Sequence, residues 1–198
     1  MARIEPLSPD QLSGPLKAEL TSAEALMGFT PNDLLIMARW PALLDAAKPL
    51  VTLLYGPGEI DPTLKRLVAT VVSGAAGCRY CQAHTAHGAV RMLGADPERI
   101  SEVWNFRSSP LFTDAERAAL ELAQAAGQQP NAATDQHFVE LRKHFTERGI
   151  LEIVGLLALF GFLNRWNDTL ATPLEAAPLG FALQTLRPED WNPGKHVL

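Results

Sequence analysis

The stretch from Ile150 to Leu163 constrains the fold more strongly than any other part of the chain. It contains 14 residues, and Glu152 is the only charged one among them. A helix that is apolar on nearly every face has to be buried, since no side of it can meet water favourably. The run is shorter than the roughly 20 residues that a membrane-spanning helix needs. We therefore expect it to form the central helix of a domain or of a subunit interface.

Helix signals also dominate the rest of the chain, and the alternating pattern that is typical of strands is nearly absent. Asp61-Pro62 has the N-cap and the first-turn proline of a helix start, and Thr113 to Glu116 has the pattern of a capping box. Further helices are predicted over about 16–27, 31–40, 42–55, 61–75, 78–92, 96–104, 113–126 and 134–144. The prolines after Thr172 predict an extended C-terminal tail whose apolar side chains dock on the parent domain or on a neighbouring subunit. We find no repeat and no linker, so residues 1–198 are predicted to form one all-α domain.

The charge balance narrows the possible partners. The chain carries 17 Lys and Arg residues against 22 Asp and Glu residues, which gives a net charge of −5. A nucleic-acid-binding surface needs clustered positive charge, so no nucleic acid partner is expected. The N-terminal residues lack the apolar core of a signal peptide, and no apolar run is long enough to span a membrane. We therefore predict a cytoplasmic protein without a membrane partner.

The candidate chemistry lies within residues 77–88, which hold both cysteines and two of the five histidines. On a helix, Cys78 and Cys81 lie about 60° apart, and His84 lies about 60° beyond Cys81. The side chains of Cys81 and His84 can therefore meet. His87 is about 120° from Cys81, on the flank of the same helix.

The two thiols are predicted to begin a helix, because Gly77 directly precedes Cys78. Unsatisfied backbone N–H groups and the positive end of the helix dipole stabilise a thiolate at that position, and Arg79 adds a cation. A neighbouring imidazole can take up the thiol proton, and the second cysteine can resolve an oxidised first one as a disulfide. These are the parts of a thiol peroxidase or of a disulfide-exchange enzyme.

Three other interpretations of the same residues stay open. Four side chains could serve as zinc ligands, namely Cys78, Cys81, His84 and His87, although one short helix cannot easily wrap them around a metal ion. Both thiols can instead be inert, buried groups. A thioredoxin-type site also has a CxxC motif before a helix, but there the motif follows a strand, whereas the residues before Cys78 have a helical pattern.

The run from Val71 to Ala86 resembles the core of the AhpD-like alkylhydroperoxidases, within the carboxymuconolactone decarboxylase family. The similarity lies in a helix followed by Gly-Cys, an aromatic residue between the cysteines, and then Ala-His with small residues. Phe160 to Arg165 is similar to the helix that ends in Asn-Arg in the peroxidase-related branch of that family. The resemblance covers about residues 30–170.

The resemblance implies an all-α helical bundle that assembles as a trimer, a hexamer or a dimer. It implies a peroxidase in which Cys81 attacks a hydroperoxide, Cys78 resolves the product as a disulfide, and His84 acts as the base. No bound cofactor and no metal are expected, and an external dithiol would restore the reduced enzyme. The cysteines are typically missing from the decarboxylase branch, so their presence favours the redox branch.

Two positions depart from the family pattern. The histidine usually lies four residues after the second cysteine, where this chain has Thr85, and His84 is one residue earlier. A glutamate is common 12 residues before the first cysteine, where this chain has Arg66, which cannot act as a base. Arg66 can instead lower a thiol pKa or bind an anionic group of the substrate. The acids considered as replacements for the glutamate are Glu59, Asp61, Glu121 and Asp168.

Two alternative functions follow from these departures. The first is a lyase or isomerase acting on a small carboxylate, with His84 as the acid and base and Arg66 binding the carboxylate. The second is a non-catalytic oligomeric scaffold with inert thiols. The remaining histidines, His137, His144 and His196, are predicted to lie on the surface.

Overall fold

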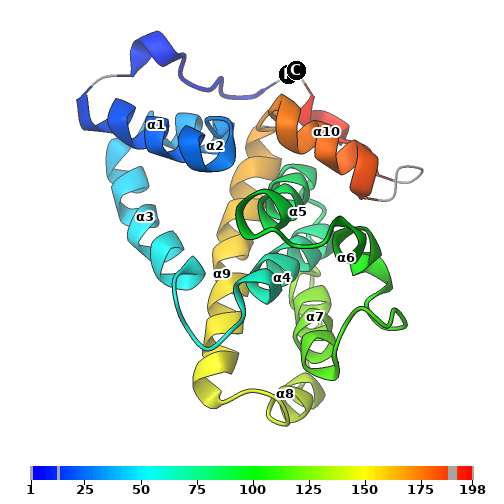
Figure 1. Ribbon diagram of the computed structural model, residues 1–198. Coiled ribbons are helices and arrows are strands. Elements are labelled where there is room, and N and C mark those ends of the chain that lie inside the picture. The colour runs from blue at the N-terminus through cyan, green and yellow to red at the C-terminus, as the bar shows by residue number, and fades with distance from the viewer. Residues whose placement is uncertain (1, 13, 187–190, 198) are drawn as a thin grey trace.

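A computed structural model describes residues 2–12, 14–186 and 191–197, and every regular element in these ranges is helical (Figure 1). The α-helices are α1 (Gly14–Met27), α2 (Asn32–Met37), α3 (Pro41–Tyr55), α4 (Pro62–Ala75), α5 (Arg79–Leu93), α6 (Pro97–Ser101), α7 (Asp114–Ala126), α8 (Asp135–Leu141), α9 (Glu147–Leu170) and α10 (Ala176–Thr185). Three short 3-10 helices accompany them, η1 (Pro9–Gln11), η2 (Glu102–Asn105) and η3 (Gly194–His196). The predicted all-α fold class is confirmed.

The core is built around the antiparallel pair of α4 and α5. The Asp61 carboxylate caps α4 by accepting hydrogen bonds from the backbone N–H groups of Thr63, at 2.8 Å, and Leu64, at 3.1 Å, as the sequence predicts. Helices α7, α9 and α10 pack around this pair. Fully buried apolar side chains in this cluster include Leu67, Val68, Val71, Ala83, Ala86, Leu120, Ile153 and Leu156. The CxxC motif, between α4 and α5, is thereby held inside the main core.

Helix α9 is the long apolar helix that the run from Ile150 to Leu163 predicts. By length and composition alone it is apolar enough to cross a membrane, with a mean hydropathy of 1.4 over a window that is 50% buried. It packs against α3, α4, α5 and α7, and its outer side exposes Leu151 and Phe162. We interpret it as a core helix of the fold, because its inner side supplies the buried residues that cover α4 and α5.

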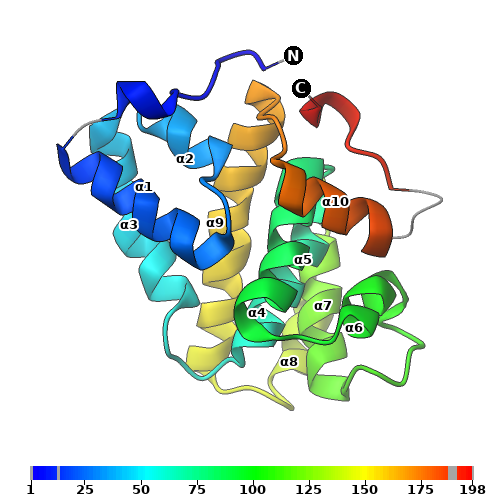
Figure 2. The same cartoon turned by 45° about the horizontal axis from the view of Figure 1, so that its top comes forward.

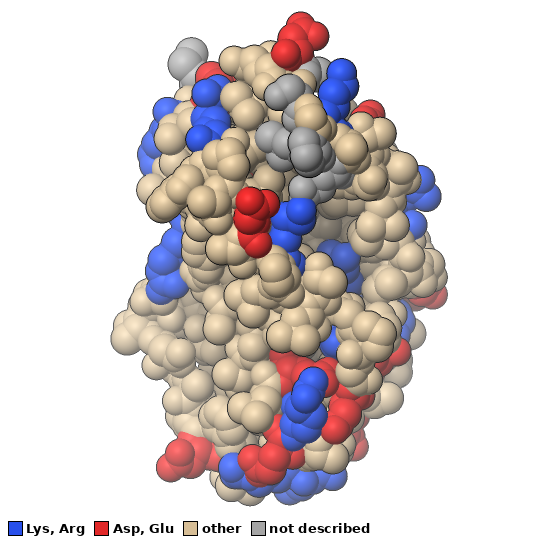
Figure 3. All heavy atoms as spheres, turned by 90° about the vertical axis from the view of Figure 1, so that its left-hand side faces the viewer, with Lys and Arg blue, Asp and Glu red and all other residues tan. Residues whose placement is uncertain are grey.

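Helices α1, α2 and α3 lie on one side of α9, and α4 to α7 lie on the other (Figures 1 and 2). A second small core joins them to α9, where Met37 and Leu44 are buried against Leu163 and Trp166. The face seen in Figure 3 is mostly uncharged, with a few acidic and basic side chains in its middle and both kinds together at its lower end. Helix α1 packs against α5, so the N-terminal helices lie along one side of that helix.

The C-terminal residues differ from the prediction. Helix α10 occupies the middle of the segment that was expected to be extended, so that expectation is wrong over 176–185. Pro173 precedes the helix and Pro178 lies in its first turn, where a missing N–H does no harm. Pro188 lies outside the described residues. Ala182 of α10 is fully buried on the core and Trp191 is 5% exposed, which agrees with the expected docking of the tail on its parent domain.

Candidate functional site

The two cysteines lie at the start of α5, and both are free thiols. Cys78 is the N-cap residue, and its Sγ accepts a hydrogen bond from the backbone N–H of Cys81 at 3.3 Å. Gly77 precedes it with a φ of 78°, in the left-handed region that favours glycine. The cysteine side chains are almost fully buried, Cys78 at 0% and Cys81 at 3% exposure. The sharp turn at Gly77 thus sends both thiols into the core.

The Cys81 thiol has a polar contact from another helix. The Asn167 side-chain amide on α9 donates a hydrogen bond to Cys81 Sγ at 3.5 Å. Burial raises the pKa of Cys81 well above its ordinary value, and the neighbouring Cys78 thiol raises it further. Arg79 hydrogen-bonds Gln82 at 3.3 Å. At Cys81, burial therefore disfavours the thiolate that the helix start was expected to stabilise.

His84 lies one turn beyond Cys81, in a mostly buried position with 11% of its side chain exposed. Its Nε2 is 2.6 Å from Oε2 of Glu175. The ring stacks on Tyr80 at a centroid distance of 4.1 Å and receives the edge of Phe29 at 5.3 Å. Among the residues that the structure describes, no hydrogen bond joins His84 to Cys81. The helix places the two side chains on neighbouring faces, but the only hydrogen-bond partner of the imidazole in the described ranges is a carboxylate.

Glu175 is the acid that supports the histidine. Besides His84, its carboxylate accepts hydrogen bonds from the Tyr80 hydroxyl, at 3.1 Å, and from the backbone N–H of Asn32. Burial alone would raise the pKa of Glu175, but His84 and the backbone N–H of Asn32 outweigh burial and lower it below its ordinary value. Glu175 is therefore ionised beside His84 at neutral pH.

The acids considered from the sequence for this role lie in other places. Glu59 accepts a hydrogen bond from Thr146, Asp61 caps α4, Glu121 pairs with Arg107 and Asp168 pairs with Lys195. Glu175 was missed because it follows His84 by 91 positions in the chain. One signal could have identified it, since it is the only charged residue between 169 and 186, a stretch that is otherwise uncharged and mostly apolar.

The loop that carries Glu175 is anchored on both sides. The Asn32 side-chain amide donates to the carbonyl of Pro173 at 2.9 Å. His196 Nδ1 lies 2.8 Å from the carbonyl oxygen of Thr172, and the N–H of Leu174 donates to the carbonyl of His196 at 2.8 Å. His196 is only 1% exposed, so its predicted place on the surface is wrong. Its imidazole instead holds the loop in position.

Asp33 is a second carboxyl group near the thiols. Its backbone N–H donates to the Tyr80 hydroxyl at 3.2 Å, and its carboxylate accepts from the N–H of Leu34 at 2.8 Å. Burial raises the pKa of Asp33, His84 opposes that rise and Glu175 adds to it. The same carboxyl raises the pKa of Cys81 electrostatically. Asp33 and Glu175 are thus two acids at one site whose environments move their pKa values in opposite directions.

The two unusual positions on the α4–α5 pair have different partners. Thr85, which stands where related proteins have histidine, donates to the carbonyl of Cys81 at 2.8 Å and accepts from the Thr70 hydroxyl at 2.9 Å. Arg66 lies over the ring of Tyr55, 4.1 Å from its centroid.

His87 lies between two aromatic rings, Phe29 at 5.8 Å and Phe181 at 5.7 Å. Burial lowers the pKa of His87, and the nearby His84 lowers it further.

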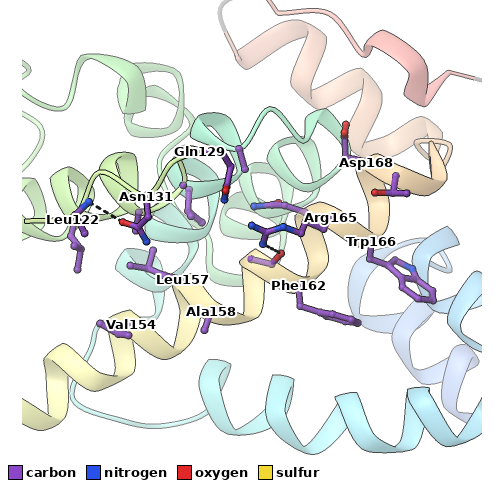
Figure 4. Close-up of a pocket in the computed structure, with 18 of the residues that line it drawn as sticks. Leu122, Gln129, Asn131, Val154, Leu157, Ala158, Phe162, Arg165, Trp166 and Asp168 are labelled. Atoms are coloured by element: carbon purple, nitrogen blue, oxygen red, sulfur yellow. Dashed lines mark hydrogen bonds between the residues drawn. The ribbon is translucent and has the colours of Figure 1, made fainter.

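A separate groove of about 1010 Å³ runs along the outer side of α9 (Figure 4). Val154, Leu157 and Phe162 of α9 line it, together with Leu122 of α7. Arg165 extends over it, and its guanidinium donates to the carbonyl of Gly161 at 2.8 Å (Figure 4). Neither cysteine nor His84 is among its lining residues. This groove and the thiols therefore lie in different places.

No metal site is evident in the part of the chain that the structure describes. In those ranges, no group of three or more His, Cys, Asp or Glu side chains is arranged to hold a metal ion. The two cysteines point into the core, and His84 is bound to Glu175. What the arrangement offers is a dithiol beside an imidazole–carboxylate pair.

The site that the structure defines is a pair of free cysteines at a helix start, inside an all-α bundle. The sequence model of the carboxymuconolactone decarboxylase family matches residues 41–125. The chain is 29% identical over 116 residues to the uncharacterized protein YnjA of Escherichia coli (strain K12), a match that covers 59% of this chain and 63% of that protein. The match to the carboxymuconolactone decarboxylase family therefore covers less than half of the chain and includes both cysteines and His84.

Solved structures share the fold of this chain. The debrominase Bmp8 is 33% identical, with a TM-score of 0.83 over 90% of this chain and 95% of that one. A Cys-to-Ala variant of the same debrominase, in complex with 2,3,4-tribromopyrrole, has a TM-score of 0.85 at 32% identity and covers 92% of this chain and 96% of its own. An AhpD-core, peroxidase-related protein from Ralstonia eutropha JMP134 shares the fold, with a TM-score of 0.77 at 23% identity over 92% of this chain and 95% of its own. The family and these neighbours indicate an enzyme.

Proposed function

We propose that the protein is a thiol-dependent peroxidase that reduces hydroperoxides through Cys81 and Cys78. The observation that carries the proposal is the contact of 2.6 Å between His84 and Glu175, one turn from a buried cysteine pair. A buried thiol with a raised pKa is a poor nucleophile until a base removes its proton. An imidazole held by a carboxylate is such a base.

The carboxylate selects the tautomer of the histidine. Because Glu175 is ionised and can only accept, the proton of a neutral His84 ring lies on Nε2. The lone pair is then on Nδ1, the nitrogen without a hydrogen-bond partner among the described residues. Nδ1 is the atom that would take the Cys81 proton, either directly after a side-chain rotation or through the bound hydroperoxide or a water molecule. Glu175 would stabilise the resulting imidazolium.

The first chemical step consumes the hydroperoxide. The Cys81 thiolate attacks one peroxide oxygen, a sulfur–oxygen bond forms, and the oxygen–oxygen bond breaks. The leaving alkoxide takes up one proton and departs as an alcohol, and Cys81 is left as a sulfenic acid. Asp33, whose raised pKa keeps a proton on the carboxyl group to higher pH, is a candidate proton donor alongside the His84 imidazolium.

The second step uses Cys78. Its thiol attacks the sulfur of the sulfenic acid, a disulfide forms, and water leaves. Cys78 is suitably placed, because its Sγ already contacts the backbone N–H of Cys81. An external dithiol then reduces the disulfide by exchange and supplies the two electrons of each cycle. We also propose a cytoplasmic location, where such dithiols are maintained.

A second candidate, reductive dehalogenation, is favoured by the 33% identity to the debrominase Bmp8. The Cys81 thiolate would then take the halogen from a haloarene, and the resulting carbanion would take up a proton. Attack by Cys78 on the sulfenyl halide would release halide and form the same disulfide. The two candidates share the thiols, the base and the reductant, and they differ only in the bond that is broken.

We propose further that the protein forms a homo-oligomer, as the resemblance to its family implies. Exposed apolar side chains on the outer sides of α3 and α9 support this, among them Leu53 at 66% and Leu151 at 65% exposure. Light scattering after size-exclusion chromatography would measure the assembly directly. A monomer at micromolar concentration would contradict this part of the proposal.

The peroxidase proposal is tested by following the loss of cumene hydroperoxide, or the release of bromide from 2,3,4-tribromopyrrole, in the presence of a dithiol. We expect the wild-type protein to turn over at least one substrate, and Cys81→Ser to abolish that turnover. Peroxide loss without bromide release supports the peroxidase, and the converse supports the dehalogenase. Equal rates in wild type, Cys81→Ser and Cys78→Ser would overturn both the peroxidase and the dehalogenase. If the protein then turned over a small carboxylate, and this turnover required His84, the result would point to the lyase.

A further inference from the structure

We infer that Arg66 and the Tyr55 hydroxyl form a subsite for the anionic group of an elongated organic substrate, most simply a carboxylate. This inference rests on the proposed function, because it supplies the substrate class of the same site. It begins from a cation on α4 that the described structure leaves without a counter-ion.

Arg66 has no carboxylate partner within the described residues. Its guanidinium lies over the Tyr55 ring, 4.1 Å from the centroid, and donates to the Met92 thioether at 3.4 Å. Both neighbours contact the cation without neutralising its charge. A partly buried guanidinium with free N–H groups is well suited to bind a carboxylate, whose two oxygens match its planar fork.

The surrounding helices hold the guanidinium in place. Gly88 of α5 lies directly beneath it, and a Cβ at that position would come within 3.1 Å of an Arg66 nitrogen. The absence of a side chain at Gly88 therefore leaves space for Arg66 between α4 and α5. Tyr55 is itself held by the edge-on ring of Phe160, at a centroid distance of 6.5 Å. The residues that form and support the subsite thus lie on four helices, α3, α4, α5 and α9, and not on a surface loop.

The Tyr55 hydroxyl supplies the second polar group. It is buried, and it has no hydrogen-bond partner among the residues that the structure describes. A buried donor without a partner destabilises the unliganded protein. An acceptor on the bound ligand would remove that free-energy cost. Burial raises the pKa of Tyr55, the Arg66 guanidinium opposes that rise, and the Cys81 thiol adds to it. The hydroxyl is therefore a protonated donor within electrostatic range of both the cation and the nucleophile.

The separation along α5 sets the length of the substrate. Gly88, beside Arg66, follows Cys81 by seven residues, which is two helical turns or about 10 Å. A substrate bound at both ends would carry its reactive oxygen, or its halogen, on the order of 10 Å from its anionic group. This length fits an aryl or medium-chain carboxylate and excludes hydrogen peroxide as a ligand of the whole site.

The position of Arg66 is compatible with the proposed base. Related proteins commonly have a glutamate there, and in this chain Glu175 supplies the carboxylate to the histidine from a different segment. Position 66 is consequently not needed for proton transfer. A positive charge at that position can serve binding without disturbing the imidazole–carboxylate pair.

The kinetic test compares two hydroperoxides that differ in one carboxylate, cumene hydroperoxide and its 4-carboxylate derivative. We expect wild type to prefer the carboxylate in kcat/KM, and Arg66→Gln to reduce that preference about 10- to 100-fold, as for the loss of charged hydrogen bonds. Tyr55→Phe should reduce it about 2- to 10-fold, because it removes one neutral donor and keeps the ring. Arg91→Gln, which removes an exposed cation at the end of α5, is the matched control and should keep the preference. Equal losses on both substrates in Arg66→Gln would overturn the inference.

A binding measurement separates this inference from the proposed function. Calorimetry with 4-isopropylbenzoate and with 4-isopropylbenzyl alcohol, neither of which can be reduced, reports the subsite without turnover. Tighter binding of the benzoate to wild type, lost in Arg66→Gln and kept in Arg91→Gln, would support the subsite even if no hydroperoxide were consumed. Equal binding of acid and alcohol to wild type would overturn the subsite even if the peroxidase were active. Circular dichroism melts would show that each variant is folded.

Discussion

The α4–α5 pair and the C-terminal segment meet at the same site but contribute in different ways. The pair contributes the thiols and the histidine, which lie within seven residues of one another, from Cys78 to His84. The C-terminal segment contributes Glu175, which comes from 91 positions further along. Local helix geometry is sufficient to place the first group. Only the packing of α10 and its preceding loop on α5 can place the second, so the nucleophile and the supporting acid depend on different parts of the fold.

The largest effect is expected on the α4–α5 side of this comparison. Cys81→Ser should reduce thiol-dependent turnover to the background rate, because Cys81 is the thiol that we assign as the nucleophile and a serine hydroxyl cannot form the sulfenyl intermediate. Cys78→Ser should allow one turnover and then stop, leaving Cys81 as a sulfenic acid that mass spectrometry after dimedone trapping would detect. If dimedone labelled Cys78 of the wild-type protein instead, Cys78 would be the peroxide-attacking cysteine and Cys81 the resolving one.

The next effect tests the C-terminal side. Glu175→Gln keeps the size of the side chain and removes its charge, so His84 loses the group that fixes its tautomer. We expect kcat/KM to fall about 10²- to 10⁴-fold, the usual contribution of general acid–base catalysis. Glu59→Gln is the matched control, since the Glu59 carboxylate is bound to Thr146 and should leave the rate unchanged. Similar rates in both variants would remove Glu175 from the mechanism.

A smaller effect is expected on stability in acid. The pKa of Glu175 is lower in the folded protein than its ordinary value, so its carboxylate stabilises the fold above its unfolded pKa, and this contribution is lost as pH falls through the folded pKa. The hydrogen bonds involved suggest about 1–3 kcal/mol. Urea unfolding at pH 7 and at pH 3 should therefore show a smaller pH dependence in Glu175→Gln than in wild type. An identical pH dependence would mean that Glu175 is not bound as described.

The smallest effects concern the anchoring of the tail. Trp191→Phe keeps most of the buried ring and removes the hydrogen bond from its Nε1 to Gln82, at 3.2 Å, so it should destabilise the fold by about 1 kcal/mol. Trp40→Phe, at a residue that is 63% exposed, is the control and should change the unfolding free energy little. Loss of activity in Trp191→Phe that exceeds its loss of stability would show that docking of the tail also positions Glu175.

Much of the fold was predictable because its signals are local. The capping box of Thr113 and Glu116, the Asp61 cap and the apolar pattern of α4 each depend on residues within one or two turns. The helix in the tail was not predictable in the same way. The prolines at 173 and 178 suggested an extended chain, yet both are compatible with a helix that begins between them, and the burial of Ala182 against the core decides in favour of that helix.

The site shows the same division between local and long-range information. The sequence by itself determined the cysteine pair, the turn at Gly77 that starts α5, and the place of His84 one turn after Cys81, because these follow from helical periodicity. Only the tertiary structure decided that burial raises the pKa of the Cys81 thiol, that Glu175 holds the histidine, and that Arg66 lies over the Tyr55 ring. The physical reason is that pKa values and hydrogen-bond partners depend on what surrounds a side chain in space, and here those neighbours come from α2, α3, α9 and the C-terminal segment.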